Sequence, residues 1–373
     1  MQLPHFAQLA ITGLLAASVP LAMVWMSSDP NKFRKLVWLT AFLTFDLIVF
    51  GAFTRLTDSG LGCPDWPGCY GMANPFLAHE QISAAEALLP SGPVTVVKAW
   101  IEMIHRYLAM GVGCLCVALT ATAWIQWRKH RRAEFRPGLP TATLLAVCVQ
   151  GAFGAWTVTL KLQPVIVTIH LLLAMCLLAM LCWLGARQDA VLKSTPAPAD
   201  AKGGSLRLLA RGAALVLFVQ IALGGWVSTN YATLACTGFP LCNGELIPAL
   251  DFEHGFTLWR ELGKTAAGHY LPFSALTAIH WVHRNFAYVV LIVLGLTAWR
   301  ACSVPTLGKA ARRIAIVLAL QAGTGIATVY FDFPLAIAVL HNAGAALLVV
   351  LVTMLNYQTK IRFSALAQAR PEQ

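Results

Sequence analysis

The stretch GAFTRLTDSGLGCPDWPGCYG at residues 51–71 recurs as GGWVSTNYATLACTGFPLCNG at residues 224–244. The two stretches align without a gap at an offset of 173, which matches both cysteines, the proline between them and the glycines at both ends. A second match, at an offset of 171, pairs residues 150–170 with residues 321–341. Repetition at a fixed offset indicates duplication of a structural unit. The chain is therefore expected to consist of two related halves.

Long apolar segments surround both copies of the repeat. Of the 373 residues, 58% are hydrophobic and 12% are charged, about half the charged share of an ordinary soluble domain. A run of roughly 20 apolar residues is long enough to cross a bilayer as a helix, and such runs exclude an outer-membrane barrel of short alternating strands. Nine segments are predicted to span, at 7–26, 36–54, 99–126, 140–160, 164–186, 208–229, 273–299, 311–331 and 334–357.

The repeat unit contains four of these segments, so both copies should have the same orientation in the membrane. We predict an all-α polytopic membrane protein with two pseudo-symmetric four-helix bundles and one extra N-terminal transmembrane helix. This first helix is expected to remain uncleaved, because its basic residues follow the apolar run instead of preceding it. The expected parts are the extra helix with a cytoplasmic turn (1–35), the N-terminal half (36–186), a cytoplasmic linker (187–207), the C-terminal half (208–357) and a cytoplasmic tail (358–373).

The basic residues predict the orientation. Connections on one side of the predicted helices contain 20 of the 27 Lys and Arg residues, and an excess of positive charge marks the cytoplasmic side. The net charge of +11 therefore reflects topology and contact with the lipid bilayer, and it is no evidence for a nucleic-acid partner. We predict a bacterial inner-membrane protein whose cysteine-containing loops face the periplasm.

Five of the ten histidines lie in apolar segments, where ionisable side chains are costly and usually functional. They are His105, His170, His280, His283 and His341. Within each half, two of them reach similar depths on different helices, so that facing helices could hold one planar cofactor between them. Haem iron commonly takes axial imidazole ligands. Zinc and copper also accept imidazole, but no thiolate or carboxylate completes a shell at that depth. A histidine that merely bridges two helices by a hydrogen bond is the structural alternative.

Two acidic residues in apolar segments distinguish the halves. Glu102 lies three residues before His105, on the same helix face, whereas its counterpart in the second half is His280. A buried carboxylate can carry protons or stabilise a developing positive charge; the alternative is a structural hydrogen bond. Asp46 is the second such acid, and its counterpart is Val219. The first half is therefore predicted to be the reactive one.

Arginine directly follows a candidate ligand in each half, at Arg106 and Arg284. A guanidinium group binds a carboxylate in bidentate fashion, which makes haem propionates candidate partners. The alternative is that both side chains extend to the membrane interface.

Two cysteine pairs lie in the outer loops, each with five residues between its members: Cys63 with Cys69, and Cys236 with Cys242. An oxidising periplasm favours disulfides, and the spacing does not suit the usual zinc knuckle. Spacing alone leaves open whether these bridges are structural or redox-active.

The run TRLTDSGLGCPDWPGC at 54–69, followed by EMIHR at 102–106, resembles the haem A synthase family of aerobic bacteria and mitochondria. The resemblance covers residues from about 36 to 357 and leaves out the first helix. It implies that His283 and His341 hold a resident haem b, with its iron, and that His105 and His170 bind the substrate, haem O. The family oxidises the C8 methyl of haem O to a formyl group by successive oxygenation steps, which gives haem A for cytochrome oxidase.

The resemblance also implies further roles. Glu102 matches the family's essential carboxylate, Cys63 and Cys69 match a pair thought to assist haem handling or electron supply, and His280 is expected to support a ligand without binding iron. Haem O synthase is an expected partner. The sequence does not identify the electron donor, and it leaves open whether the chain forms a homo-oligomer.

Three other functions compete with this interpretation. A di-haem cytochrome b that only carries electrons would need equivalent halves, with no reason for Glu102 to differ from His280. A membrane thiol oxidoreductase would use the loop cysteines and contain no haem. A haem transporter would bind haem O without converting it.

Overall fold

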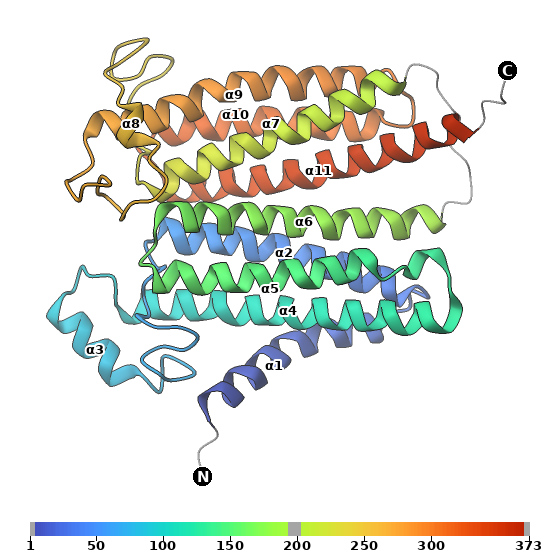
Figure 1. Cartoon of the computed structure of the whole chain (residues 1–373), viewed down its shortest axis with the longest axis horizontal. Coiled ribbons are helices and arrows are strands. Elements are labelled where there is room, and N and C mark those ends of the chain that lie inside the picture. The colour runs from blue at the N-terminus through green and yellow to red at the C-terminus, as the bar shows by residue number, and fades with distance from the viewer. Residues whose placement is uncertain (1–3, 193–202, 369–373) are drawn as a thin grey trace. The chain divides into compact units, whose positions relative to one another are not determined.

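The computed structural model describes residues 4–192 and 203–368, and throughout these ranges the regular secondary structure is helical (Figure 1). The predicted all-α class is confirmed. The helices are α1 (His5–Trp25), α2 (Lys32–Leu56), α3 (His79–Leu88), α4 (Val96–His130), the 3₁₀ helix η1 (Ala133–Phe135), α5 (Gly138–Thr159), α6 (Pro164–Leu192), α7 (Gly203–Thr229), α8 (Phe252–Gly255), α9 (Phe273–Cys302), α10 (Gly308–Tyr330) and α11 (Leu335–Gln368).

Nine helices in the described ranges are long and apolar enough to cross a membrane, namely α1, α2, α4, α5, α6, α7, α9, α10 and α11. Each corresponds to one predicted segment, and every start agrees to within five residues. The largest difference is at the end of α11, which continues to Gln368 although the apolar segment ends at residue 357. Apolar composition indicates only the part of a helix that lies in the hydrocarbon of the bilayer. The helical hydrogen bonds of α11 continue past this part into polar residues.

The chain forms two compact units. The first unit is Met1–Leu181 with Leu258–Lys264, and the second is Cys182–Thr257 with Thr265–Gln373. In the second unit, α7 and α10 each pack against both α9 and α11, which closes a ring of four helices. In the first unit, α4 packs against α1, α2 and α5. The pseudo-symmetric relation of the bundles stays a prediction, and residues 193–202 of the expected linker lie outside the described residues.

A disulfide-closed loop follows the first repeated helix in each unit. We call residues 57–78 the first loop and residues 230–251 the second loop. Cys63 is bonded to Cys69 in the first loop, and Cys236 to Cys242 in the second. Both predicted cysteine pairs are therefore joined. Each loop also contains a short antiparallel bridge that begins at the second cysteine of its pair, to Met72 and Glu245 respectively, so the two copies are closed in the same way.

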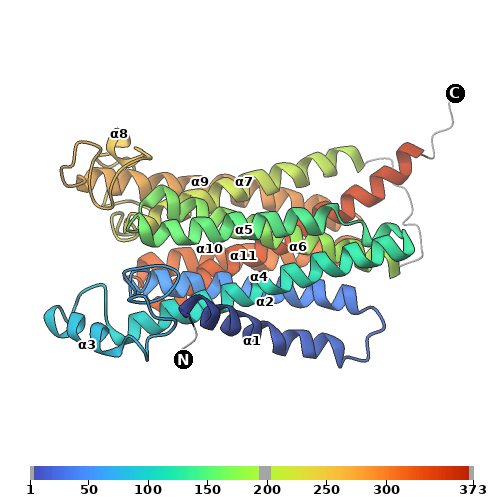
Figure 2. The same cartoon turned by 60° about the horizontal axis from the view of Figure 1, so that its bottom comes forward.

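The extra helix α1 lies along α4 (Figures 1 and 2). A Cβ at Gly13 of α1 would lie 3.0 Å from the Cβ of Met110 on α4, so the glycine allows the two helices to approach closely. Small residues favour helix association in lipid because they increase backbone packing. Leu9 of α1 is buried in the same apolar cluster as both cysteines of the first loop. The extra helix therefore covers part of that loop.

Gly62 sets how closely the first loop approaches α4. A Cβ at this position would lie 2.4 Å from the carbonyl carbon of Lys98 and 2.6 Å from the backbone nitrogen of Ala99. Because helix backbone cannot move aside locally, we expect Gly62→Ala to destabilise the protein by about 1–3 kcal/mol, the usual cost of overpacking. Thermal unfolding of the purified protein in detergent measures this. Gly113→Ala is the control, since nothing lies within 4 Å of a Cβ there; equal melting temperatures for the two variants would contradict the prediction.

Candidate functional site

The four predicted ligand histidines lie on four different helices. In the first unit, His105 is on α4 and His170 is on α6; in the second, His283 is on α9 and His341 is on α11. Each pair is close enough for its two imidazoles to interact electrostatically, and all four side chains are half-buried. Each unit therefore brings together the two histidines that the sequence analysis paired.

A glycine on a neighbouring helix faces each imidazole. A Cβ at Gly51 of α2 would lie 2.8 Å from Nε2 of His105, and one at Gly224 of α7 would lie 2.9 Å from Cε1 of His283. Real Cβ atoms do not approach ring atoms this closely, so a side chain at either glycine would push the imidazole away. Gly51 and Gly224 are equivalent in the repeat, so an imidazole packs against the same helix position in both units.

The other two histidines have the same environment. Gly154 of α5 and Gly325 of α10 would place a Cβ 3.2 and 3.1 Å from Cε1 of His170 and His341, respectively. A glutamine lies four residues before each of these glycines. The side-chain nitrogen of Gln150 is 3.4 Å from Nε2 of His170, and that of Gln321 is 3.3 Å from Nε2 of His341.

These glutamine contacts favour one tautomer of the two rings. An amide nitrogen can only donate, so Nε2 of His170 and of His341 accepts, and the ring proton is on Nδ1. An imidazole in this form has its lone pair on Nε2, which can bind a metal when the metal takes the place of the glutamine amide. The arrangement provides one such nitrogen in each unit, on His170 and on His341.

A haem fits this donor set. Among the described residues, no group of three or more His, Cys, Asp or Glu side chains is placed to hold a metal ion. Zinc and copper sites built by protein need three or four such ligands, whereas haem iron already has four porphyrin nitrogens and needs at most two axial imidazoles. The glycines beside the rings allow each imidazole to lie directly against a neighbouring helix, which fixes its place in the bundle.

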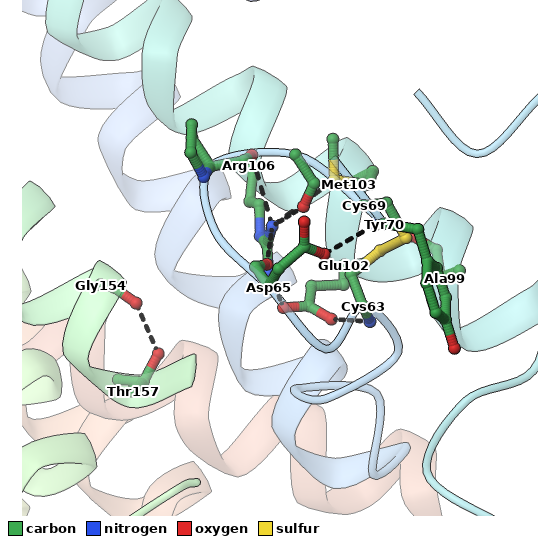
Figure 3. Close-up of polar contacts among 12 residues, drawn as sticks. Cys63, Asp65, Cys69, Tyr70, Ala99, Glu102, Met103, Arg106, Gly154 and Thr157 are labelled. Atoms are coloured by element: carbon green, nitrogen blue, oxygen red, sulfur yellow. Dashed lines mark hydrogen bonds and ion pairs between the residues drawn. A yellow bond between two sulfur atoms is a disulfide. The ribbon is translucent and has the colours of Figure 1, made fainter. Parts of the chain in front are cut away.

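Glu102 connects α4 to the first loop (Figure 3). It lies three residues before His105, and only 4% of its surface is exposed. One carboxylate oxygen, Oε2, accepts a hydrogen bond of 2.8 Å from the backbone nitrogen of Cys63. The other, Oε1, forms an ion pair with Arg106. The carboxylate thus adjoins the disulfide, on the helix that carries His105 one turn further on.

Arg106 is held by the first loop (Figure 3). Its Nη1 donates to the carbonyl oxygens of Asp65 at 2.9 Å, Pro67 at 3.3 Å and Gly68 at 2.6 Å. These bonds give Arg106 a role that the sequence analysis did not consider, because the guanidinium fixes the first loop to α4. The two predicted roles were extension of the side chain to the membrane interface and binding of a haem propionate. A contact with haem propionates stays a prediction.

Arg284 has the same position in the second unit. Its guanidinium donates to the carbonyls of Cys236 at 3.3 Å and Leu241 at 3.2 Å, and also to that of Gly238. It also lies over the ring of Phe239, 5.1 Å from the centroid. The repeated arginine is therefore explained by the repeated loop.

His280 occupies the position of Glu102 in the second unit. It is 5% exposed, and its imidazole lies near the backbone of Ala232 in the second loop. Glu102 and His280 thus have equivalent places, since each lies beside a loop on the helix that bears a candidate ligand. They differ in charge: only the first unit has a buried carboxylate there.

Asp46 is not part of this cluster. It is exposed on α2 and lies five residues before Gly51, roughly 140° around the helix at 3.6 residues per turn. The face of α2 that meets His105 is therefore not the face that carries Asp46. Its function stays open.

Sequence reasoning identified the histidines but not the residues that surround them. Gly51 and Gly224 begin the first repeat match, and Gln150 and Gln321 begin the second. Their identity in both halves was visible in the alignment. What the alignment could not show is that each faces an imidazole, because the contacts join helices that are distant in the sequence.

Comparisons with known proteins agree with this architecture. The model of a family described as cytochrome oxidase assembly protein matches residues 34–353, which leaves α1 outside. A Shewanella oneidensis protein named Heme A synthase is 38% identical over 329 residues, which cover 87% of this chain and 96% of the relative. Proteins with the same name from Caulobacter sp. strain K31 and Caulobacter vibrioides are each 30% identical, and the matches cover 87% of this chain and 95% of each relative.

Proposed function

The chain belongs to the cytochrome oxidase assembly protein family, and we propose that it is a haem A synthase. This enzyme oxidises the C8 methyl of haem O to a formyl group by successive hydroxylations, giving haem A for cytochrome oxidase. The observation that carries the proposal is the pair of imidazole sites combined with the buried Glu102 in only one of them. Near full-length similarity to proteins named Heme A synthase supports it.

The two sites have different roles in this proposal. His105 and His170 bind haem O, and His283 and His341 hold a resident haem b. When bound, the haem b supplies a redox centre that relays electrons. No amino-acid side chain can oxidise a methyl C–H bond, so the protein contributes binding, orientation and electrostatics.

Glu102 is the proposed catalytic residue. Its carboxylate is buried one helical turn from His105, and it is held on both oxygens by Cys63 and Arg106. A fixed negative charge beside the substrate stabilises positive charge that develops at the methyl carbon as electrons leave it. Because its partners already fix its position, little reorganisation is needed during the reaction.

The proposal places the protein in the bacterial inner membrane, with both disulfide loops in the periplasm. The excess of basic residues in the opposite connections supports this orientation, and disulfides persist in an oxidising compartment.

Co-expression with haem O synthase tests the proposed activity. Haems extracted from the membranes should include haem A, whereas cells expressing haem O synthase alone should contain haem O but no haem A. Accumulation of haem O without haem A or a hydroxylated intermediate would contradict an enzyme and favour a transporter or an electron-carrying cytochrome b. Absence of any bound haem would favour the thiol oxidoreductase.

Removal of one ligand from each pair tests the division of roles. We expect His283→Ala to lower the haem b content of the purified protein about tenfold or more, the effect of disturbing a metal ligand set. His105→Ala should retain haem b and lose conversion of haem O. His79→Ala is the control, since this exposed residue begins α3. Loss of the same haem from both ligand variants would show that the two sites are not distinct.

A further inference from the structure

The two units differ in how they hold the Nδ1 side of the imidazoles. Thr324 of α10 places its hydroxyl oxygen 3.1 Å from Nδ1 of His341. The same hydroxyl lies 3.1 Å from the carbonyl oxygen of Gln321, to which it donates its hydrogen. The hydroxyl oxygen is therefore free to accept the ring proton of His341.

The first unit lacks this contact. At the repeat offset of 171, the counterpart of Thr324 is Phe153, which has no acceptor. Nδ1 of His170 is buried and has no hydrogen-bond partner among the described residues. His170 and His341 are otherwise alike, because each has an equivalent glycine beside Cε1 and an equivalent glutamine at Nε2. The difference is confined to one hydrogen bond.

The remaining pair of histidines also differs at Nδ1, although an amide nitrogen there can only donate to the ring, so it fixes the ring orientation without making Nε2 more basic. The side-chain nitrogen of Gln220 on α7 lies 3.2 Å from Nδ1 of His283. The counterpart of Gln220 at the offset of 173 is Leu47, so the first unit again has an apolar residue where the second has a polar one. Both imidazoles of the second unit therefore have a polar side chain at Nδ1.

We propose that Thr324 is a positioning residue that makes the second unit retain its haem permanently, and that Phe153 leaves the first unit able to exchange its haem. The inference rests on the proposed function, in which one haem is resident and the other must enter and leave. A hydrogen bond from Nδ1 fixes the ring orientation and increases the basicity of Nε2. His341 therefore binds iron more firmly than His170, which has no such partner.

The substrate site gains from the missing contact. A haem that arrives as substrate and departs as product must leave its ligands at every turnover, and a ring without a fixed orientation releases iron more readily. A resident cofactor has the opposite requirement. The first unit has Phe153 and Leu47 where the second has Thr324 and Gln220. This difference allows one unit to exchange its haem and the other to retain it, although both use two histidine ligands.

Transfer of haem b to apomyoglobin, with the full-length protein in detergent, tests the proposal. Thr324→Val removes the hydroxyl and keeps the side-chain shape, so we expect transfer to become roughly 10–100-fold faster, the typical effect of losing such a contact. Thr324→Ser retains an oxygen and should transfer at nearly the rate of the unaltered protein. Equal rates for Thr324→Val and the unaltered protein would overturn the proposal.

The midpoint potential of haem b provides a second readout, which a purely structural role would leave unchanged. A more basic imidazole favours ferric iron, so Thr324→Val should raise the potential. If the variant loses ten times more affinity for ferric haem than for ferrous haem, the midpoint potential rises by about 59 mV. An unchanged potential together with faster transfer would assign Thr324 to packing and overturn the electronic part.

The reciprocal variant tests the first unit. In a His283→Ala chain loaded with protohaem, Phe153→Thr should slow transfer from the His105 and His170 pair; unchanged transfer would oppose the proposal. Failure of the proposed function is recognisable separately, because co-expression of the unaltered protein with haem O synthase would then give no haem A. If haem A is formed and Thr324→Val behaves identically to the unaltered protein, only the inference about Thr324 is wrong.

Discussion

Glu102→Gln is expected to lower the ratio of haem A to haem O in membrane extracts by about 100-fold or more, the range seen when a preorganised electrostatic group is lost from an active site. Glutamine keeps an oxygen that can accept the hydrogen bond from Cys63. It removes the negative charge, which is the property proposed to act on the substrate. The change therefore separates the catalytic role of the side chain from its attachment of the first loop.

The matched control is Glu86→Gln. Glu86 also accepts a backbone hydrogen bond, at 3.0 Å from the nitrogen of Val96 at the start of α4, but it is remote in sequence from the ligand histidines. We expect conversion of haem O to continue in this variant. The reactivity of Cys63 and Cys69 toward maleimide should remain low in both variants, because the disulfide is unaltered. Normal haem A formation in Glu102→Gln, with both haems bound, would remove Glu102 from the mechanism.

The membrane helices were predictable because one physical requirement dominates them. Each apolar segment must cross the hydrocarbon with its backbone hydrogen bonds satisfied internally, so length and composition indicate a helix without knowledge of its neighbours. The short helix α3 had no comparable signature. It lies outside the apolar segments, where amphipathic patterning over ten residues is weak evidence.

The histidine pairs were predictable for a related reason. An imidazole in an apolar segment is unusual, and the repeat showed which histidines correspond. The contacts of Arg106 were not predictable, because they are made with three backbone carbonyls whose positions depend on the path of the first loop. Every residue has a backbone carbonyl, so the sequence does not show which carbonyls an arginine will meet. From the sequence alone, a haem propionate was therefore considered as the partner of Arg106.

The two loops show how far the repeat has diverged while keeping its shape. In the first loop, the carboxylate of Asp65 accepts hydrogen bonds of 2.6 Å from the backbone nitrogens of Tyr70 and Gly71. In the second loop, Asn243 binds the backbone of Thr237 and Ala235. Asp65 and Asn243 are not equivalent in the alignment. Different side chains therefore stabilise the same disulfide-closed turn, which a comparison of matched positions cannot reveal.

The second large effect is expected for Arg106→Gln. The guanidinium holds three carbonyls of the first loop and pairs with the buried carboxylate of Glu102. Removing one partner of a buried ion pair leaves an uncompensated charge and costs about 3–5 kcal/mol. We expect a large fall in the melting temperature of the haem-depleted protein, together with faster proteolysis within the first loop.

Arg284→Gln is the matched control, because Arg284 holds the carbonyls of the second loop and pairs with no carboxylate in the described part of the chain. Its removal costs hydrogen bonds and leaves no buried charge alone, so the melting temperature should fall less than in Arg106→Gln. The double variant Arg106→Gln, Glu102→Gln should recover part of the stability, since it removes both charges, while haem A formation remains absent.

Haem-depleted protein distinguishes this loop-fixing role from a role toward haem propionates. If Arg106 acted only on a propionate, its replacement would leave the melting temperature of the haem-depleted protein unchanged and would lower only haem affinity. Equal effects of Arg106→Gln and Arg284→Gln would instead show that the ion pair with Glu102 adds nothing to stability. A specific loss in Arg106→Gln, with partial recovery in the double variant, would mean that the carboxylate beside His105 depends on Arg106 to remain buried and charged.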